Sequence, residues 1–155
     1  PPHELPQARA LLAEIGEAFG ASFGDQVTGA AGRRRRLELA MRVIGQYERE
    51  LSRHLIDGLQ RIDGIHVIGL TETERLHERV PTVIFTVAGK TPLEVTAAMG
   101  RKGIYLWDGN YYALAVMERL GLEGRGGAVR VGPVHYNTLA EVDHFLGELK
   151  AISSA

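Results

Sequence analysis

The sequence contains no cysteine. This absence excludes disulfides, thiolate nucleophiles and cysteine-based metal sites from the chain. Long hydrophobic runs are also missing: no apolar stretch approaches the roughly 18 residues of a membrane-spanning helix, and no signal-peptide pattern opens the chain. We therefore expect a cytoplasmic location and no membrane partner.

The chain has no excess of one charge, since 18 Lys and Arg stand against 19 Asp and Glu. A near-neutral protein attracts neither nucleic acid nor an anionic membrane through its overall field. The local exception is the run of four arginines from Arg33 to Arg36. This run could bind phosphates, or it could form a solvated loop and helix start. We favour the second interpretation because the sequence carries no nucleic-acid-binding motif.

Histidine pairs at the spacing of a helical zinc site are absent too. The six histidines lie at positions 3, 54, 66, 77, 135 and 144, and no two of them are four residues apart. We predict no metal site. His54 adjoins an apolar helical stripe and is expected to be structural. The glycine-rich segment 124–127 lacks the spacing of a phosphate-binding loop and is predicted to be a turn.

The length of 155 residues suits one domain, or one domain plus an appended segment. Residues 4–19 show helical spacing, and the Gly-rich segment 20–32 has no period and suggests a flexible connection. We therefore predict an N-terminal helix and flexible connection over residues 1–31 and a main domain over residues 32–155. Because the chain opens on Pro1 and its first methionine is Met41, we expect a fragment or a processed product.

The main domain alternates helices and strands. An apolar stripe predicts a helix over residues 37–62 that ends at Gly64 in a left-handed cap. Strands are predicted at residues 65–69, 80–87, 104–107 and 128–131, with loops at 70–79 and 121–127, and further helices at 91–102, 111–120 and from Thr138 onward. The strand over residues 80–87 is nearly all apolar and is expected to be central, with Pro81 near its start. Capping boxes open the helices at Thr91 and Thr138.

This order predicts an α+β fold in two layers: a small mixed or antiparallel sheet of three or four strands with helices on one face.

The candidate binding residue is Arg130, at the end of a short apolar strand. A guanidinium there can bind a carboxylate through two parallel hydrogen bonds. The polar, aromatic segment of residues 107–112 joins a strand to a helix and could form a pocket wall. We favour the alternative, in which Asp108 or Asn110 caps the helix and the aromatic residues pack. His135 could contact a ligand, or could form a turn together with Asn137. No complete catalytic apparatus is visible, so we assign no catalytic residue.

From about Gly32 to Ile152, the chain resembles the C-terminal small domain of class V aminotransferase-like enzymes. These are pyridoxal-phosphate enzymes of fold type I, and the group includes cysteine desulfurases and selenocysteine lyases. The resembling motifs are Arg79–Thr86, Lys102–Tyr105, Asp108–Tyr112, Val129–Val131, His135–Thr138 and Glu141–Asp143. The sequence Trp-Asp-Gly-Asn-Tyr-Tyr, which begins at Trp107, fits the cysteine desulfurase-like branch best.

The resemblance implies that Arg130 binds the α-carboxylate of an amino-acid substrate. It also makes Asn110, Tyr111, Tyr112 and His135 the other candidate substrate-binding residues. Desulfurases carry their catalytic cysteine in this loop, at the position of Tyr112 here, so persulfide chemistry on this chain is not expected. Transamination, β-elimination and racemisation stay open for the parent enzyme.

In this family, pyridoxal 5'-phosphate is held by a large domain that supplies the Schiff-base lysine and the acid paired with the pyridinium nitrogen. None of the lysines here, Lys90, Lys102 and Lys150, matches the lysine motif. The resemblance therefore implies that this chain alone is inactive and binds no cofactor, that its partners are the missing large domain and an amino-acid substrate, and that the enzyme is a homodimer. The alternative is a non-catalytic α+β module for small-carboxylate binding or assembly.

Overall fold

The computed structural model describes residues 4–154, with side chains from residue 6 onward, so His3 lies outside the described residues. The chain divides into two compact units, Pro1–Glu48 and Arg49–Ala155. Helix α2 (Gly32–Gln60) contributes residues to both units. The predicted boundary between residues 31 and 32 falls just before α2, and it stays a prediction for the domain organisation.

The first unit contains α1 (Glu4–Phe19), as predicted, and the 3-10 helix η1 (Gly20–Gln26). The sequence predicted no regular structure for η1. Arg35 supplies the reason, because its guanidinium donates hydrogen bonds to the carbonyls of Val27 and, at 2.9 Å, of Gly24. These long-range bonds hold a segment whose own residues show no helical period.

The run of four arginines forms the first turn of α2, which begins five residues before the predicted start at Leu37. Arg34 binds Glu38 at 2.8 Å, and Arg36 binds Glu17 of α1 at 3.1 Å. Cations at a helix N-terminus oppose the helix dipole, and these acidic partners offset that effect. Three of the four arginines, counting Arg35, therefore bind groups of this chain.

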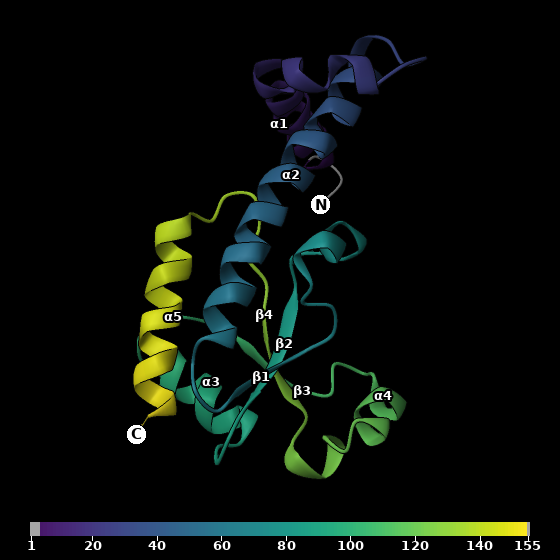
Figure 1. Cartoon of the computed structure of the whole chain (residues 1–155). Helices are drawn as coiled ribbons and strands as arrows, with labels where there is room; N and C mark the ends of the chain where they lie inside the picture. Colours follow the sequence, from purple (N-terminus) through teal and green to yellow (C-terminus); the bar gives the residue numbers. More distant parts are fainter. Residues whose placement is uncertain (1–3, 155) are drawn as a thin grey trace. The chain divides into compact units, whose positions relative to one another are not determined.

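The second unit is built on a four-stranded antiparallel sheet with the strand order β1-β2-β4-β3 (Figure 1). The strands are β1 (Ile65–Ile68), β2 (Val83–Val87), β3 (Trp107–Gly109) and β4 (Ala128–Val131). The α+β class is confirmed, and β2 is central, as its apolar sequence predicted. Gly64 has a φ of 79° just before β1, as expected for a left-handed cap.

Helices cover one face of this sheet. The rings of Phe85 on β2 and Phe145 on α5 (Leu139–Ser153) meet edge to face, with centroids 6.4 Å apart. Gly58 of α2 lies against Leu146 of α5, where a Cβ would come within 2.2 Å of a methyl group. His54 also links these helices, since its Nε2 lies 2.5 Å from the Asp143 carboxylate. Both α5 and α3 (Pro92–Gly100) begin with the predicted capping boxes.

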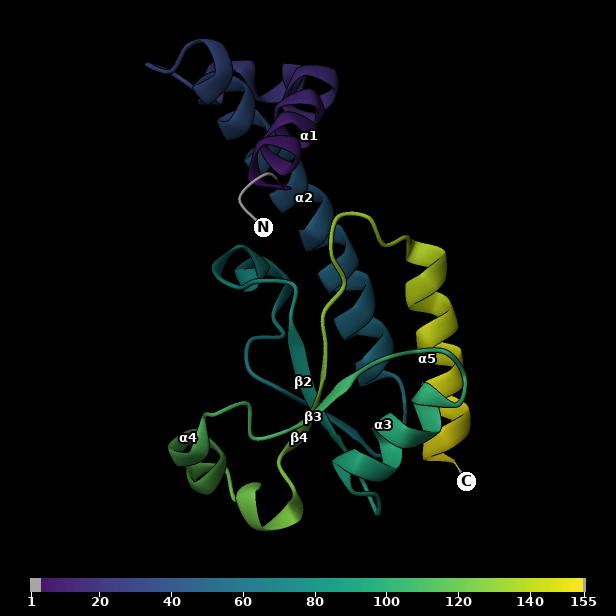
Figure 2. The ribbon, with the colours of Figure 1, turned by 180° about the vertical axis from the view of Figure 1, so that it is seen from behind.

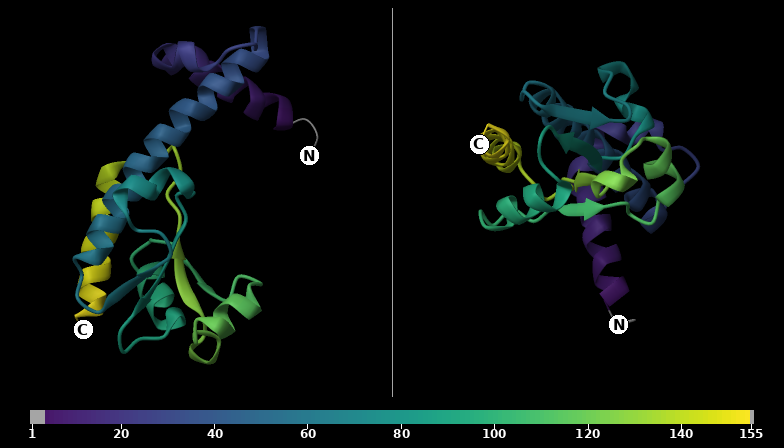
Figure 3. Two further views of the ribbon diagram at one scale, coloured as in Figure 1. Left: turned by 45° about the vertical axis from the view of Figure 1, so that its right-hand side comes forward. Right: turned by 90° about the horizontal axis from the view of Figure 1, so that it is seen from below.

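The opposite face is covered only in part. The segment formed by α4 (Leu114–Arg119) and η3 (Glu123–Arg125) lies on the side of the sheet away from α5 (Figures 2 and 3). Its buried residues Met117 and Leu122 pack with Ala128 of β4, and Ile84 of β2 lies against the same cluster. The rest of this face carries the candidate site.

Two element boundaries differ from the prediction near that site. The third strand, predicted at residues 104–107, begins only at Trp107 because the Ile104 backbone N–H donates to the Met99 carbonyl and so completes the end of α3. The helix predicted from Tyr111 begins at Leu114. Tyr111 and Tyr112 instead have φ angles of 54° and 59°, a left-handed conformation that cannot continue an α-helix.

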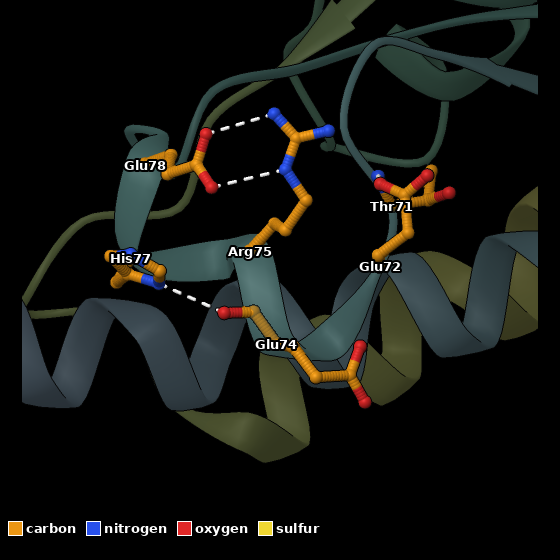
Figure 4. A network of polar contacts seen from close by, with 6 residues as sticks. All are labelled: Thr71, Glu72, Glu74, Arg75, His77 and Glu78. Carbon is orange, nitrogen blue, oxygen red and sulfur yellow. Dashed lines mark hydrogen bonds and ion pairs between the residues drawn. The ribbon is translucent and has the colours of Figure 1, made fainter.

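The β1–β2 connection, predicted to be a loop, contains the 3-10 helix η2 (Thr73–Glu78). Arg75 donates two hydrogen bonds of 3.0 and 2.9 Å to the Glu78 carboxylate, and the His77 ring bonds the Glu74 carbonyl (Figure 4). Arg79 then donates to the backbone carbonyls of Leu70, Val80 and Thr82 and so ties the two ends of the connection together. Within residues 4–154, no helix is long and apolar enough to cross a membrane.

Candidate functional site

The site is centred on Arg130 of β4. In the register of the sheet, Arg130 is paired with Ile84 of β2 on one side and Trp107 of β3 on the other. Directly paired residues of neighbouring strands project to the same face. Phe85 projects to the opposite face, against Phe145. Arg130 is therefore on the sheet face that lies away from α5, and it is half-buried there.

The Arg130 guanidinium is held by aromatic rings. Its central carbon lies 5.0 Å from the centroid of the Trp107 ring and 5.0 Å from that of the Tyr111 ring. Cations are attracted to aromatic faces at this distance. Across the described part of the chain, no carboxylate or carbonyl oxygen bonds this guanidinium, so its charge and N–H donors stay available to a ligand.

Tyr111 contributes its ring to the site, while its hydroxyl is committed to the sheet. The hydroxyl donates to the carbonyl of Ala128 on β4 and also lies 3.2 Å from that of Trp107 on β3. Burial raises the pKa of Tyr111 to about 12, against a smaller opposing effect of the Arg130 charge. The phenol therefore stays protonated at neutral pH and cannot serve there as a general base.

Asn110 organises the loop before α4. Its side-chain oxygen accepts a hydrogen bond of 3.1 Å from the Tyr112 backbone N–H, as in an Asx turn. Its amide nitrogen donates to Glu123 of η3 at 3.2 Å. The neighbouring Asp108 accepts a bond of 2.8 Å from Thr96 of α3. The expectation that Asp108 or Asn110 caps the following helix was wrong, because the N-cap of α4 is Ala113 and no side chain caps it. Both residues instead bond neighbouring segments.

The remaining candidates belong to the segments before α4 and after β4. The Tyr112 side chain is fully exposed. His135 follows β4, and its ring meets Tyr136 edge to face at 5.6 Å. Asn137 accepts a 2.9 Å hydrogen bond from the Val134 N–H, which forms the predicted turn. The structure thus brings Tyr111 to Arg130, places Asn110 and Tyr112 in the same loop, and leaves His135 in the segment that follows.

The sequence analysis did not list Trp107 or Glu123 as site residues, although Trp107 lies in the aromatic segment 107–112 that it singled out. Trp107 was visible as an aromatic residue of a predicted strand, but its position opposite Arg130 depends on the strand register. Glu123 lay in a segment predicted to be a turn, and its link to Asn110 joins two segments that are separated by α4. No local sequence pattern predicts either contact.

The lysines of this chain do not fit a Schiff-base site. Lys102 pairs with Glu148 at 3.2 Å, and Lys150 is exposed on α5. Lys90 lines a cavity of about 310 Å³ together with His66 and Arg125, and this cavity does not include Arg130. Over the described residues, no group of three His, Asp or Glu side chains is placed to hold a metal ion.

Comparison with known proteins gives consistent matches. The Aminotransferase class-V family model matches residues 26–145. A Mycolicibacterium paratuberculosis protein named "Probable cysteine desulfurase" is 33% identical over 74% of this chain and 16% of its own length. An aminotransferase-like protein of Gibberella zeae is 38% identical over 70% of the chain and 27% of its own length.

Solved structures agree with the sequence matches. The apo cysteine desulfurase of Thermococcus onnurineus superposes with a TM-score of 0.67 at 27% identity, over 79% of this chain and 29% of that one. The chain therefore spans less than a third of the length of each of these proteins. The agreement of family model, relatives and fold places the chain in the aminotransferase class-V family, among relatives that include cysteine desulfurases.

Proposed function

We propose that Arg130 binds the carboxylate of an amino-acid substrate in a pyridoxal-phosphate-dependent enzyme that contains this chain. The observation that carries the proposal is the half-buried Arg130 on an open sheet face, with two aromatic contacts and no acidic partner among the side chains of residues 6–154. Burying an unpaired charge is unfavourable, so such a group is best explained by a ligand that supplies the opposite charge.

A carboxylate fits this arginine better than other anions. The planar guanidinium fork matches the two oxygens of a carboxylate in a bidentate pair. Trp107 is 61% exposed, so the ligand can approach the open side of the sheet. A ligand on this open face would still be reached by water, and we propose that a second domain supplies the walls that exclude it.

We further propose that this second domain holds the cofactor and that the enzyme acts as a homodimer in the cytoplasm. The short coverage of the relatives supports a longer enzyme. In such an enzyme the cofactor supplies the electron sink for amino-acid chemistry. This chain contributes Arg130, which binds and orients the substrate, and the Asn110–Tyr112 loop beside it. With no cysteine available, Tyr112 offers no thiol, so a reaction other than persulfide formation on this chain is proposed.

The binding role can be tested on this chain. Trp107 is the only tryptophan, and its ring contacts Arg130, so its fluorescence reports directly on the site. We expect L-alanine and acetate to change this fluorescence saturably, and Arg130→Ala to abolish the change. Arg125→Ala is the matched control, because it removes the same charge from an exposed position on η3. Equal binding by wild type and Arg130→Ala would contradict the proposal.

In the whole enzyme, losing a desolvated carboxylate contact costs on the order of 2–5 kcal/mol. Arg130→Ala is therefore expected to lower kcat/KM for amino acids by at least about 30-fold. Arg130→Lys should be impaired as well, because one ammonium cannot reproduce the two parallel bonds. If the whole protein binds carboxylates but forms no Schiff-base absorbance with added pyridoxal phosphate, the non-catalytic binding module is the correct interpretation.

A further inference from the structure

We propose that Trp107 and Tyr111 are positioning residues that hold the Arg130 guanidinium ready for a carboxylate before the ligand arrives. This inference rests on the proposed function of Arg130. It gives Trp107 a positioning role that requires no contact with the ligand. It also gives the Tyr111 ring a role other than contact with the substrate.

The chemistry of the contact supports this role. A carboxylate partner would neutralise Arg130 and occupy its N–H donors. An aromatic ring attracts the cation through its quadrupole and accepts no conventional hydrogen bond from the guanidinium edge. Two rings at 5.0 Å therefore restrain the side chain while its charge and donors stay available. The rings thus restrain the guanidinium without neutralising its charge.

The clamp of Trp107 and Tyr111 is itself anchored. Trp107 lies on β3 directly opposite Arg130, so the sheet register sets its position. The Tyr111 hydroxyl bonds carbonyls of both β3 and β4, which ties its ring to the same two strands. Its left-handed backbone is part of the Asn110–Tyr112 turn, and the Asn110 amide is held in turn by Glu123. The ring is thus fixed from its hydroxyl and from its backbone.

A restrained arginine binds more tightly because less conformational freedom is lost on binding. The rotamer entropy of a whole arginine side chain, converted to an equilibrium ratio, corresponds to about 30-fold in affinity, which is the upper limit for the clamp. The benefit is greatest for a ligand that needs the guanidinium in one fixed plane, as a bidentate carboxylate does.

The first experiment measures the restraint in the ligand-free chain. Nitrogen-15 relaxation of the arginine Nε–H groups gives an order parameter for Arg130, with the exposed Arg125 as an internal reference. We expect a higher order parameter for Arg130 than for Arg125 in the wild-type chain, and a fall to the Arg125 value in Trp107→Leu and Tyr111→Leu. Trp107→Phe keeps an aromatic face and should restore most of the restraint. An Arg130 as mobile as Arg125 in the wild-type chain would overturn the proposal.

The second experiment measures affinity for acetate and L-alanine by chemical-shift titration of the same variants. We expect the leucine variants to bind up to about 30-fold more weakly and Trp107→Phe to stay within about threefold of wild type. Unchanged affinity in a leucine variant with a mobile Arg130 would refute the positioning role. If the wild-type chain binds neither ligand, carboxylate binding by this chain alone is refuted, and the relaxation data still decide whether the rings restrain Arg130.

A control must show that a loss of affinity does not come from unfolding of the variant. Far-UV circular dichroism and urea midpoints show whether each variant is folded. Tyr111 packs against a buried cluster, so Tyr111→Leu could unfold the loop. Trp107 is 61% exposed, so Trp107→Leu removes little buried surface. If Tyr111→Leu does not fold, the comparison of Trp107→Leu with Trp107→Phe decides the question alone.

Discussion

The substitution Gly127→Ala tests how closely β3 and β4 must approach to form the site. A Cβ at Gly127 would lie 2.1 Å from the carbonyl oxygen of Gly109 and 2.3 Å from its carbon. Both contacts are with backbone atoms, so no side-chain rotation relieves them. Gly127 also has a φ of 84°, which strains any residue with a side chain.

The expected magnitude has two sources. A left-handed conformation costs an L-residue about 1–2 kcal/mol. Forcing a backbone shift in a packed region costs about another 1–3 kcal/mol. We therefore expect Gly127→Ala to lower the free energy of unfolding by about 2–5 kcal/mol. Because Gly109 is paired with Ala128 next to Gly127, the shift should also move Trp107 on the same strand away from Arg130.

Two other glycines separate these effects. Gly121 has a φ of 69°, and a Cβ added there would meet no atom within 4 Å, so Gly121→Ala tests the strain alone, at about 1–2 kcal/mol. Gly124 has neither a left-handed φ nor a close neighbour, and Gly124→Ala should change stability by less than about 1 kcal/mol. The assay is urea unfolding followed by far-UV circular dichroism, with Trp107 fluorescence as the local signal. The reasoning fails if Gly127→Ala costs no more than Gly121→Ala.

Four further predictions concern the β1–β2 connection, the buried phenol and the last helix. Arg79→Met should lower the free energy of unfolding by about 1.5–3 kcal/mol because it removes charged hydrogen bonds to backbone carbonyls. The control Arg75→Met loses only an exposed ion pair and should lower it less in the same urea assay. The pKa of Tyr111 is raised to about 12 from 10.0, so its contribution to stability is complete below pH 10 and is lost as pH rises to about 12. Tyr111→Phe should remove this part of the urea-midpoint profile, and an unchanged slope would contradict the assignment. Thr138→Ala should cost about 1 kcal/mol of stability through the lost cap. Hydrogen bonding, chiefly from the Thr138 backbone N–H, lowers the pKa of Glu141. The contribution of Glu141 to stability is therefore present above pH 4.5 and is lost as pH falls through the lowered pKa. Acid titration of the stability of Glu141→Gln against that of wild type measures this loss.

The features that sequence predicts well here are those set by neighbouring residues. The capping boxes at Thr91 and Thr138 lie within single turns, and both form. The apolar stripe of α2 and the β-branched sequence of β2 predict a helix and a central strand, and both are present. Periodicity and capping depend on residues about four positions apart, so both can be recognised from the sequence without the tertiary structure.

The candidate site could be predicted only in part. A guanidinium at the end of an apolar strand indicated Arg130, and the motifs around it indicated the family that the comparisons confirm. The neighbours of Arg130 could not be chosen in the same way. The helical pattern after Asn110 suggested that Tyr111 was helical, whereas its hydroxyl bonds to β3 and β4 accompany a left-handed backbone.

The sequence by itself determined the types of the main elements, the absence of a thiol and the presence of one well-placed arginine. The tertiary structure alone decided that Trp107 lies opposite Arg130 and that no acid of the described residues neutralises it. The physical reason is that strand register and side-chain contacts join residues far apart in the chain. Their free energies depend on packing across the whole sheet, which no local pattern records.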